Sequence, residues 1–363
     1  MREHNFTAGP AVLPQEVVQQ LQDSLPNYKQ SGLGLMEMSH RSKAFDDIIL
    51  SAKSRLRTLL NIPEEYSVLF LQGGASMQFY MSALNLLGPN DIGEYIDTGT
   101  WSSKAVKEAK RCSNSKVIWA PENAYTRVPD SSEYGQSEDA VYLHYTSNNT
   151  IYGTQFHERP KGRRLIADLS SDICSKTIDV AAHELIYAGA QKNLGPSGVT
   201  VIILSPWAVE RSRQIDRIRD GGLPSMLNYG LMVDKASLFN TPNTFGIYAL
   251  EIMLKWLQDL GGVSAIAEVN TAKANLLYQT LDSSDFWLPH AEASSRSQMN
   301  VTFKIKKPEL EPLFLKEAQA AGLHGLKGHR SVGGLRASIY NACPMSSVQA
   351  LVDFMNAFEQ AHS

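Results

Sequence analysis

The sequence predicts an α/β protein in which helices cover a mostly parallel sheet and a smaller α+β domain follows. Three observations predict this fold class. Short apolar runs alternate with helical patterns through the first two thirds of the chain, which is typical of parallel sheets joined by helices. Beyond Asn240 the pattern changes to long helices. The 363 residues also exceed what one hydrophobic core usually holds, so we expect two domains.

Each expected strand is a short apolar run bounded by glycine, polar or charged residues. In chain order the runs read SVLFL, GEYID, KVIWA, AVYLHY, RRLIAD, LIYAG and VTVIIL. Bounded runs rich in β-branched and aromatic residues favour strands. The segments MQFYMSALNLL and SSKAVKEAK lie between them, and their apolar spacing favours helices.

The last third is expected to hold two long helices and then a small domain. FGIYALEIMLKWLQDLGG and VSAIAEVNTAKANLLYQTLD repeat apolar residues at helical spacing, and Gly261-Gly262 should separate them. The tail then reads strand, helix, strand, helix. We therefore expect a large domain over residues 16–260 and a small domain over 261–363. We also expect residues 1–15 to form an N-terminal segment near the small domain and near the functional site.

Charge and cysteine content exclude several classes of protein. Lys and Arg total 34 against 37 Asp and Glu, a net charge of -3, which is unlike a nucleic-acid binder. The three cysteines are far apart, which predicts neither disulfides nor a metal site and favours a reducing, cytoplasmic setting. No run approaches the ~18 apolar residues of a membrane helix, so we expect a soluble protein.

Polar residues follow several expected strands, at the sheet edge where open α/β sheets bind ligands. SVLFL runs into Gly73-Gly74-Ala75-Ser76 and then a helix, so free N–H groups could cradle an anion. No G-K-[ST] follows, so this is not a nucleotide P-loop. Alone the signal is weak, because Gly-Gly after a strand is more often a tight turn.

Asp168 ends the run RRLIAD, and its carboxylate would be costly to bury without a partner. It could meet a cation, or it could cap the following segment with Ser170 or Ser171. Trp101 also follows a strand and could be a flat platform or a packing residue, of which packing is the commoner role.

Lys192 lies in YAGAQKNLGPSGVT, between an apolar run and a Gly-Pro turn. By itself it is most simply a solvated loop lysine. Together with the anion cradle at Gly74, Ala75 and Ser76, with Asp168 and with Trp101, it predicts a pyridoxal phosphate site. That cofactor needs a lysine for its aldehyde, a cradle for its phosphate, an acid for its ring nitrogen and an apolar cover.

Two basic clusters, one near each end of the chain, could receive an anionic substrate. His40 and Arg41 lie in MSHRS, and His329, Arg330 and Arg336 lie in KGHRSVGGLR. Either cluster could be a solvated surface patch. In the context of a pyridoxal phosphate site they predict a receptor for two anions, with Arg336 taking the α-carboxylate bidentately and the others the distal group.

The chain also resembles the phosphoserine aminotransferases along essentially its whole length. The resemblance is carried by NFTAGPAVLP, EMSHRSKAF, LQGGASMQF, ADLSSDI, IYAGAQKNLGPSG, FNTPNTF and GLKGHRSVGGLRASIYNA. It implies a fold-type I pyridoxal-phosphate-dependent transferase with a seven-stranded, mostly parallel sheet. It implies a homodimer with shared active sites that transfers the amino group of L-glutamate to 3-phosphohydroxypyruvate, giving O-phospho-L-serine and 2-oxoglutarate, in serine biosynthesis. A role in pyridoxine synthesis is left open.

The resemblance also assigns roles to residues. Lys192 would bind the cofactor aldehyde and move the proton, Asp168 would pair with the pyridine nitrogen, and Trp101 would stack on the ring. The phosphate would be bound by Ala75, Ser76, Gln191 and, from the second subunit, Asn240 and Thr241. Thr150 would contact the cofactor oxygen, and Thr7 and Ala8 would line the substrate side. Some members have Gly-Arg at Ala75-Ser76, so an arginine contact is missing here.

Other chemistries on a similar fold stay open at this point. A cysteine desulfurase needs a mobile nucleophilic cysteine, and Cys343 in NACPM is more typical of packing. A glyoxylate aminotransferase is a further alternative. A non-catalytic pyridoxal-phosphate-binding regulator would normally need a DNA-binding module, for which the chain has neither spare length nor basic charge.

Overall fold

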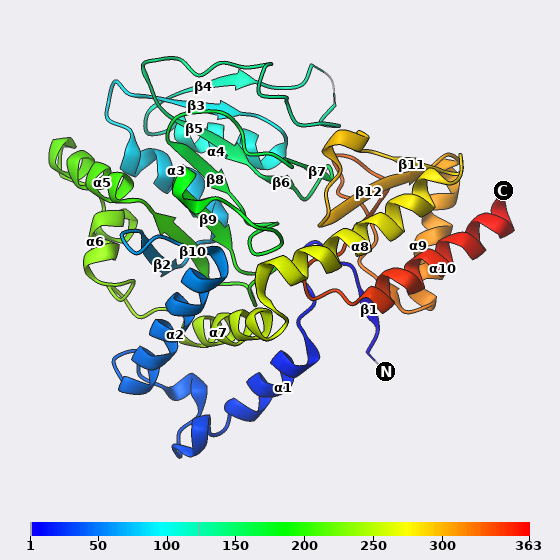
Figure 1. Ribbon diagram of the computed structural model, residues 1–363, viewed down its shortest axis with the longest axis horizontal. Coiled ribbons are helices and arrows are strands. Elements are labelled where there is room, and N and C mark those ends of the chain that lie inside the picture. Colours follow the sequence, from blue (N-terminus) through cyan, green and yellow to red (C-terminus); the bar gives the residue numbers. More distant parts are fainter. Residues whose placement is uncertain (1, 123) are drawn as a thin grey trace.

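A seven-stranded sheet forms the centre of residues 2–122 and 124–363, which a computed structural model describes (Figure 1). Its strand order is β2-β10-β9-β8-β5-β3-β4. β10 runs antiparallel to both neighbours, and the other neighbouring pairs of this sheet are parallel. The strands are β2 (Ser67–Leu71), β3 (Ile92–Ile96), β4 (Asn114–Trp119), β5 (Ala140–Thr146), β8 (Leu165–Asp168), β9 (His183–Gly189) and β10 (Thr200–Leu204). Each of the seven predicted runs is one of these strands, so the predicted fold class is confirmed.

Side chains of the inner strands alternate between two hydrophobic cores, one on each face of the sheet. In β10, for example, Val201 and Ile203 belong to one core, whereas Ile202 and Leu204 belong to the other. The first core is covered by α2 (Lys43–Leu60) and α7 (Thr244–Asp259). The second is covered by α3 (Gly74–Leu86), α4 (Thr100–Ala109), α5 (Pro206–Ile218) and α6 (Tyr229–Asp234).

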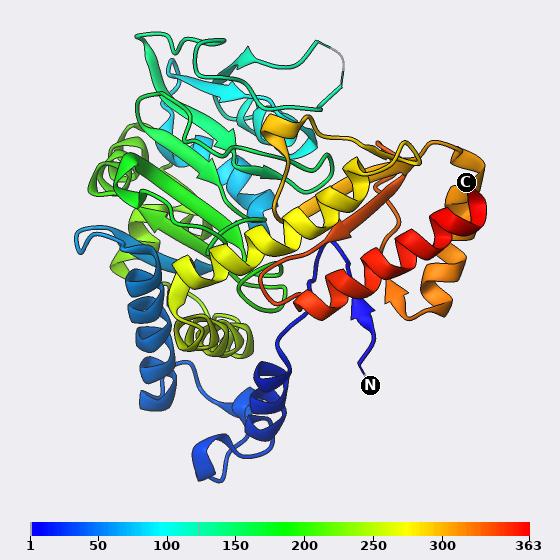
Figure 2. The ribbon, with the colours of Figure 1, turned by 45° about the vertical axis from the view of Figure 1, so that its right-hand side comes forward.

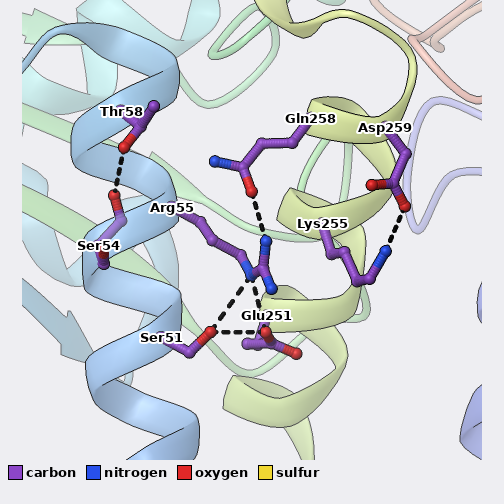
Figure 3. A network of polar contacts seen from close by, with 8 residues as sticks. All are labelled: Ser51, Ser54, Arg55, Thr58, Glu251, Lys255, Gln258 and Asp259. Atoms are coloured by element: carbon purple, nitrogen blue, oxygen red, sulfur yellow. Dashed lines mark hydrogen bonds and ion pairs between the residues drawn. The ribbon is translucent and has the colours of Figure 1, made fainter.

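A polar network joins α2 to α7 on the outer side of the first core (Figure 3). Arg55 Nε donates to Glu251 Oε1 at 2.8 Å and to Ser51 Oγ at 3.2 Å. Ser51 Oγ in turn donates to Glu251 Oε1 at 2.8 Å, and Arg55 Nη1 donates to Gln258. The network fixes the two helices against each other.

The C-terminal part forms its own core around an antiparallel sheet of β11 (Trp287–Pro289), β12 (Asn300–Ile305) and β14 (Leu335–Ser338). α7 ends before the predicted break, and α8 (Gly262–Asp282) begins after Gly261, whose φ of 98° favours glycine. The predicted strand-helix-strand-helix order is found in β12, α9 (Glu311–Ala320), β14 and α10 (Met345–His362).

Helix α8 connects the two parts, because its first turns pack on the large core and its later turns on the small one. Val263 and Ile266 belong to the large core, whereas Ala274 and Leu277 belong to the small core. We therefore propose that the sequence-predicted boundary at residue 261 divides the cores but leaves α8 in contact with both.

The N-terminal segment lies beside the small domain (Figure 2). β1 (His4–Asn5) pairs in parallel with β13 (Leu323–His324), and Phe6 is fully buried in the small core. From there the chain leads to α1 (Gln15–Ser24). A short hairpin of β6 (Asn148–Asn149) and β7 (Thr154–Gln155) follows β5. The 3₁₀ turns cover Tyr28–Gln30, Leu35–Glu37, Val180–Ala182, Ser225–Leu227, Ala293–Ser295 and Pro308–Leu310.

No helix in the described ranges is both long enough and apolar enough to cross a bilayer.

Candidate active site

A cavity of about 340 Å³ lies beyond the carboxyl ends of β5 and β8, between the sheet and the small domain. This is the edge at which open α/β sheets bind ligands. Of the residues singled out from the sequence, the cavity brings together Gly74, Ala75, Ser76, Trp101, Thr150, Asp168, Gln191, Lys192, His329 and Arg336, with Ala8 from the N-terminal segment. Segments from both domains therefore build one site.

Lys192 follows β9 in a tight turn, and its amine lies inside this cavity. Nζ donates to Thr150 Oγ1 at 2.7 Å. Although part of the side chain faces the open cavity, protein surrounds the amine, and this burial lowers the Lys192 pKa to about 8. The Asp168 carboxylate opposes the shift, and the Arg336 charge adds to it. A neutral amine, which can attack an aldehyde, is therefore accessible near neutral pH.

Gly9 approaches Lys192 closely from the N-terminal segment. A β-carbon at Gly9 would lie 3.4 Å from Lys192 Cγ, and its φ of 135° disfavours any other residue. The N-terminal segment thus covers the lysine rather than fraying.

Asp168 ends β8 with 4% of its surface exposed. One carboxylate oxygen, Oδ1, accepts from the Ser170 backbone N at 2.9 Å and from Ser170 Oγ at 2.6 Å, so the capping role is present. Within the described ranges no hydrogen bond reaches the other oxygen, Oδ2. Burial raises the Asp168 pKa, and the Ser170 hydrogen bonds and the Lys192 charge oppose the increase. A cation at Oδ2 would stabilise the carboxylate.

The N-terminus of α3 has no side-chain cap. Its N-cap residue Gly73 has a φ of 91°, and a β-carbon there would lie 2.7 Å from Met77 Cβ. A β-carbon at Gly74, by contrast, would meet no atom within 4 Å. The first N–H groups of the helix, with the positive end of its dipole, therefore suit an anion.

Trp101 lies in the first turn of α4 and lines the cavity. Its Nε1 is buried and has no hydrogen-bond partner among the described residues. The Lys104 ammonium lies 4.5 Å from the centre of the Trp101 ring. The indole is thus a cavity wall rather than only a packing residue.

Arg336 reaches the cavity from β14 in the small domain and is 9% exposed. Nη1 donates to the Thr150 carbonyl at 3.2 Å, whereas the buried Nε has no partner in the described part of the chain. Burial lowers the Arg336 pKa, although an arginine stays charged. Because Thr150 also binds Lys192, one residue spans the amine and the guanidinium.

His329 lines the same side of the cavity, and its Nδ1 lies 2.7 Å from Ser331 Oγ. Burial lowers the His329 pKa, and the charges of Arg336, Arg330 and Lys104 lower it further. A neutral imidazole would offer one N–H donor to an anion.

The other predicted site residues lie outside the cavity lining of a single chain. Thr7 precedes the lining residue Ala8, and its hydroxyl donates to the Pro10 carbonyl at 2.9 Å. Arg330 is exposed beside His329, and His40 and Arg41 form the turn before α2. Asn240 lines a separate cavity, and the neighbouring Thr241 carbonyl accepts from Gln72 at 3.2 Å. The assignment of Asn240 and Thr241 concerns a second copy of the chain.

Sequence reasoning missed several lining residues, namely Gly9, Phe79, Thr146, Asn148 and Ile151, and it considered Ser170 and Ser171 only as capping partners of Asp168. The polar run TSNNT, which begins with the last residue of β5, was an available signal for Thr146 and Asn148. Phe79 and Ile151 have the composition of ordinary core residues and could not be recognised. Among the described residues, no group of three or more His, Cys, Asp or Glu side chains is arranged to hold a metal.

Comparisons with known proteins agree on one family. Residues 4–351 match the family model for class-V aminotransferases. The chain is 50% identical over 362 residues to the phosphoserine aminotransferase of Geobacillus kaustophilus, and the matched region covers 99% of each of the two chains.

Solved structures agree with this result. A structure that records radiation damage of the Schiff base in a phosphoserine aminotransferase has a TM-score of 0.94, 46% identity, and coverage of 99% of this chain and 100% of the other. The phosphoserine aminotransferase of Trichomonas vaginalis with bound pyridoxal phosphate has a TM-score of 0.91, 36% identity, and coverage of 98% and 100%.

The cavity fits the cofactor of this family, pyridoxal phosphate. The buried amine suits the aldehyde of the cofactor, and the carboxylate with one free oxygen suits its ring nitrogen. The uncapped helix N-terminus suits the phosphate, and the indole wall suits the ring face. Three lining residues, Trp101, Thr146 and Arg336, each have a buried polar atom without a hydrogen-bond partner among the described residues. The chain belongs to the class-V aminotransferases, pyridoxal phosphate enzymes, and within them to the phosphoserine aminotransferases.

Proposed function

We propose that this protein transfers the amino group of L-glutamate to 3-phosphohydroxypyruvate, giving O-phospho-L-serine and 2-oxoglutarate, reversibly. The observation that supports this most is that a lysine amine, a buried carboxylate and a buried arginine line one cavity. An amino acid offers one amino group and one α-carboxylate. Lys192 would hold the cofactor aldehyde that receives the amino group, and Arg336 suits the α-carboxylate.

Pyridoxal phosphate, when bound, supplies an aldehyde that accepts an amino group and a ring that withdraws electrons from the substrate Cα. Lys192 Nζ is the proposed covalent attachment point and the group that moves the proton at Cα. Its lowered pKa suits both tasks, because the amine must be neutral to attack and must also accept a proton near neutral pH.

Asp168 is proposed to hold a proton on the ring nitrogen through Oδ2, while Ser170 keeps Oδ1 in place. Trp101 would lie against the ring face, and Thr150 would contact the cofactor oxygen. Thr150 is 3% exposed and already orients both Lys192 and Arg336, so it links cofactor and substrate positions.

The cofactor phosphate is proposed to lie at the N-terminus of α3, on the backbone N–H groups of Gly74, Ala75 and Ser76, with Gln191 beside it. This loop has no arginine, so the helix dipole and neutral donors supply the attraction. In a homodimer, Asn240 and Thr241 of the second copy would add further contacts.

Arg336 is proposed to take the α-carboxylate with the donors that its contact with Thr150 leaves free. His329, Arg330, His40 and Arg41 are proposed for the distal anion, and Thr7 for the substrate side. Glutamate and phosphoserine each place the distal anionic centre two connecting atoms beyond Cα, so one receptor can serve both. This economy suits an enzyme whose two substrates bind in turn.

A desulfurase function is not supported by the cysteines. Cys343 is 2% exposed in the turn before α10, and burial raises its pKa to about 11. Burial likewise raises the pKa of Cys174 to about 12 and that of Cys112 to about 11. Such thiols stay protonated at neutral pH and are poor nucleophiles.

We further propose that the protein works in the cytoplasm as a homodimer with shared sites, in serine biosynthesis and in pyridoxine biosynthesis. Sedimentation equilibrium should give twice the chain mass of 40.1 kDa. Mixed dimers of Lys192→Ala and Arg41→Gln chains should regain activity if Arg41 serves the opposite site. Without such recovery, Arg41 does not act across the dimer.

The reaction itself is tested with glutamate labelled at nitrogen with ¹⁵N and with 3-phosphohydroxypyruvate. Mass spectrometry should find the label in phosphoserine, together with unlabelled 2-oxoglutarate. Transfer to glyoxylate or pyruvate in preference to 3-phosphohydroxypyruvate would contradict the proposed substrate.

A further inference from the structure

Three buried asparagines satisfy three consecutive backbone carbonyls in the segment that follows Asp168. Asn193 Nδ2 donates to the Ile173 carbonyl at 3.0 Å, Asn341 Nδ2 to Cys174 at 2.9 Å, and Asn270 Nδ2 to Ser175 at 3.1 Å. Their exposed fractions are 1%, 3% and 0%. We call Asn193, Asn270 and Asn341 the asparagine clamp.

The members of the clamp come from three separate parts of the chain and also bind one another. Asn341 N donates to Asn193 Oδ1 at 3.0 Å, and Asn270 Nδ2 donates to Asn341 Oδ1 at 2.8 Å. Asn193 is the next residue after Lys192, and Asn270 lies on α8. Asn341 follows β14, the strand of Arg336. The clamp therefore ties the lysine turn, the segment after Asp168 and the arginine strand together.

Lys273 supports the clamp from the next turn of α8. It is 0% exposed, and Nζ donates to the carbonyls of Ile339 at 2.9 Å, Tyr340 at 2.7 Å and Cys343 at 3.1 Å. Among the described residues no carboxylate forms an ion pair with Lys273. A buried charge is costly unless hydrogen bonds compensate it, and these three carbonyls provide that compensation. In return, Lys273 holds the backbone of residues 339–343, the turn that contains Asn341.

The clamp bridges the two groups whose separation the reaction must fix. Lys192 and Arg336 are 144 positions apart (336 minus 192) and lie in different domains. The amino group and the carboxylate of an amino acid are bonded to the same Cα, so the amine and the guanidinium must be held at a constant separation. Misplacement by about 1 Å can reduce a rate roughly 100-fold.

We propose that the asparagine clamp and Lys273 are positioning residues that set Arg336 relative to Lys192 and thereby determine how well the substrate carboxylate is bound. The inference rests on the proposed function of Arg336 and Lys192. None of these four residues lines the cavity. They would act through the turns that carry Lys192 and Arg336.

The test uses Asn270→Ala in the cofactor-loaded protein, because this change removes amide donors of the clamp and leaves every cavity-lining residue in place. Asn85→Ala is the matched control. Asn85 is 0% exposed and donates to the carbonyls of Met81 at 2.9 Å and Leu227 at 2.7 Å, away from the clamp. Lys273→Met is the second variant, since it removes the charge but keeps the apolar stem.

Binding of glutarate, a five-carbon dicarboxylate without an amino group, is measured by calorimetry. We expect Asn270→Ala and Lys273→Met to weaken glutarate binding at least ~10-fold and to raise KM for glutamate and phosphoserine more than they lower kcat. The absorbance of the bound cofactor should stay unchanged. Asn85→Ala should lower the melting temperature about as much as Asn270→Ala and Lys273→Met do, but it should leave glutarate binding intact.

The inference would be overturned if Asn270→Ala and Lys273→Met bound glutarate as tightly as Asn85→Ala does. The clamp would then be a purely structural feature. If either variant fails to fold, Asn270→Ser, whose hydroxyl keeps one donor, is judged by the same criterion. Failure of the proposed function gives a different pattern, because glutarate would then bind equally well to Arg336→Gln and to the unaltered protein.

Discussion

Replacing Arg336 by Gln should weaken glutamate and phosphoserine as substrates to about the same degree. In the structure one donor of Arg336 is engaged by the Thr150 carbonyl, and the buried Nε has no partner among the described residues. A carboxylate bound there would gain charge-assisted hydrogen bonds, each worth about 1.5 to 3 kcal/mol. Loss of one such bond corresponds to roughly a 10- to 150-fold decrease in kcat/KM.

The assay measures kcat/KM in both directions, with phosphoserine and with glutamate as amino donor. Arg296→Gln is the matched control, because Arg296 also lies in the small domain but pairs with Asp282 at 2.6 Å, away from the cavity. Arg41→Gln and Arg330→Gln should instead lower kcat/KM for phosphoserine more than for glutamate, since only phosphoserine brings a distal dianion. An Arg336→Gln enzyme that loses activity with one amino acid only, or with neither, would refute the carboxylate assignment. An unchanged phosphoserine-to-glutamate ratio in both other variants would refute the distal-anion assignment.

Other substitutions test the remaining roles. Lys192→Ala should fold and retain cofactor through phosphate and ring contacts but not turn over, and near-native turnover would remove Lys192 from its proposed role. Asp168→Asn should keep the cofactor yet lose at least about 10-fold in kcat, because a neutral amide cannot stabilise a positively charged ring; unchanged transamination would place the ring nitrogen elsewhere. Cys343→Ala should leave turnover intact, whereas a folded but inactive variant would revive a thiol mechanism. In the cofactor-free protein the Lys192 pKa is about 8 when folded and 10.5 when unfolded, so the unfolded chain binds more protons between these values. The unfolding free energy relative to Lys192→Met should therefore rise by about 3 kcal/mol as pH increases from 8 to 10.5, and a flat difference in urea titrations would contradict the burial of the amine.

The sheet could be predicted from the sequence because each strand is a short apolar run with polar or glycine boundaries. β8 and β10 are buried along their whole length, and apart from the terminal Asp168 and Thr200 their residues form continuous apolar runs. The β1–β13 pair could not be predicted in this way. Each strand has two residues, and the paired His4 and Leu323 are separated by most of the chain. No local pattern encodes such a contact.

The site was predictable where a residue's chemistry is unusual for its place, as with the strand-end Asp168 and the lysine before a Gly-Pro turn. The clamp was not predictable, for the opposite reason. Asn270 and Lys273 are polar residues on a helix, and such residues normally face solvent. They are buried because α8 passes between two cores, which only the tertiary arrangement determines.

The central claim is that one cavity exchanges an amino group with phosphoserine and with the keto acid of glutamate. The most direct measurement is the absorbance spectrum of the cofactor-loaded protein after addition of phosphoserine alone and then of 2-oxoglutarate. We predict that phosphoserine converts the spectrum from that of the aldehyde form of the cofactor to that of the amine form, and that 2-oxoglutarate restores it. A spectrum that phosphoserine leaves unchanged, or a change that 2-oxoglutarate does not reverse, would contradict the account.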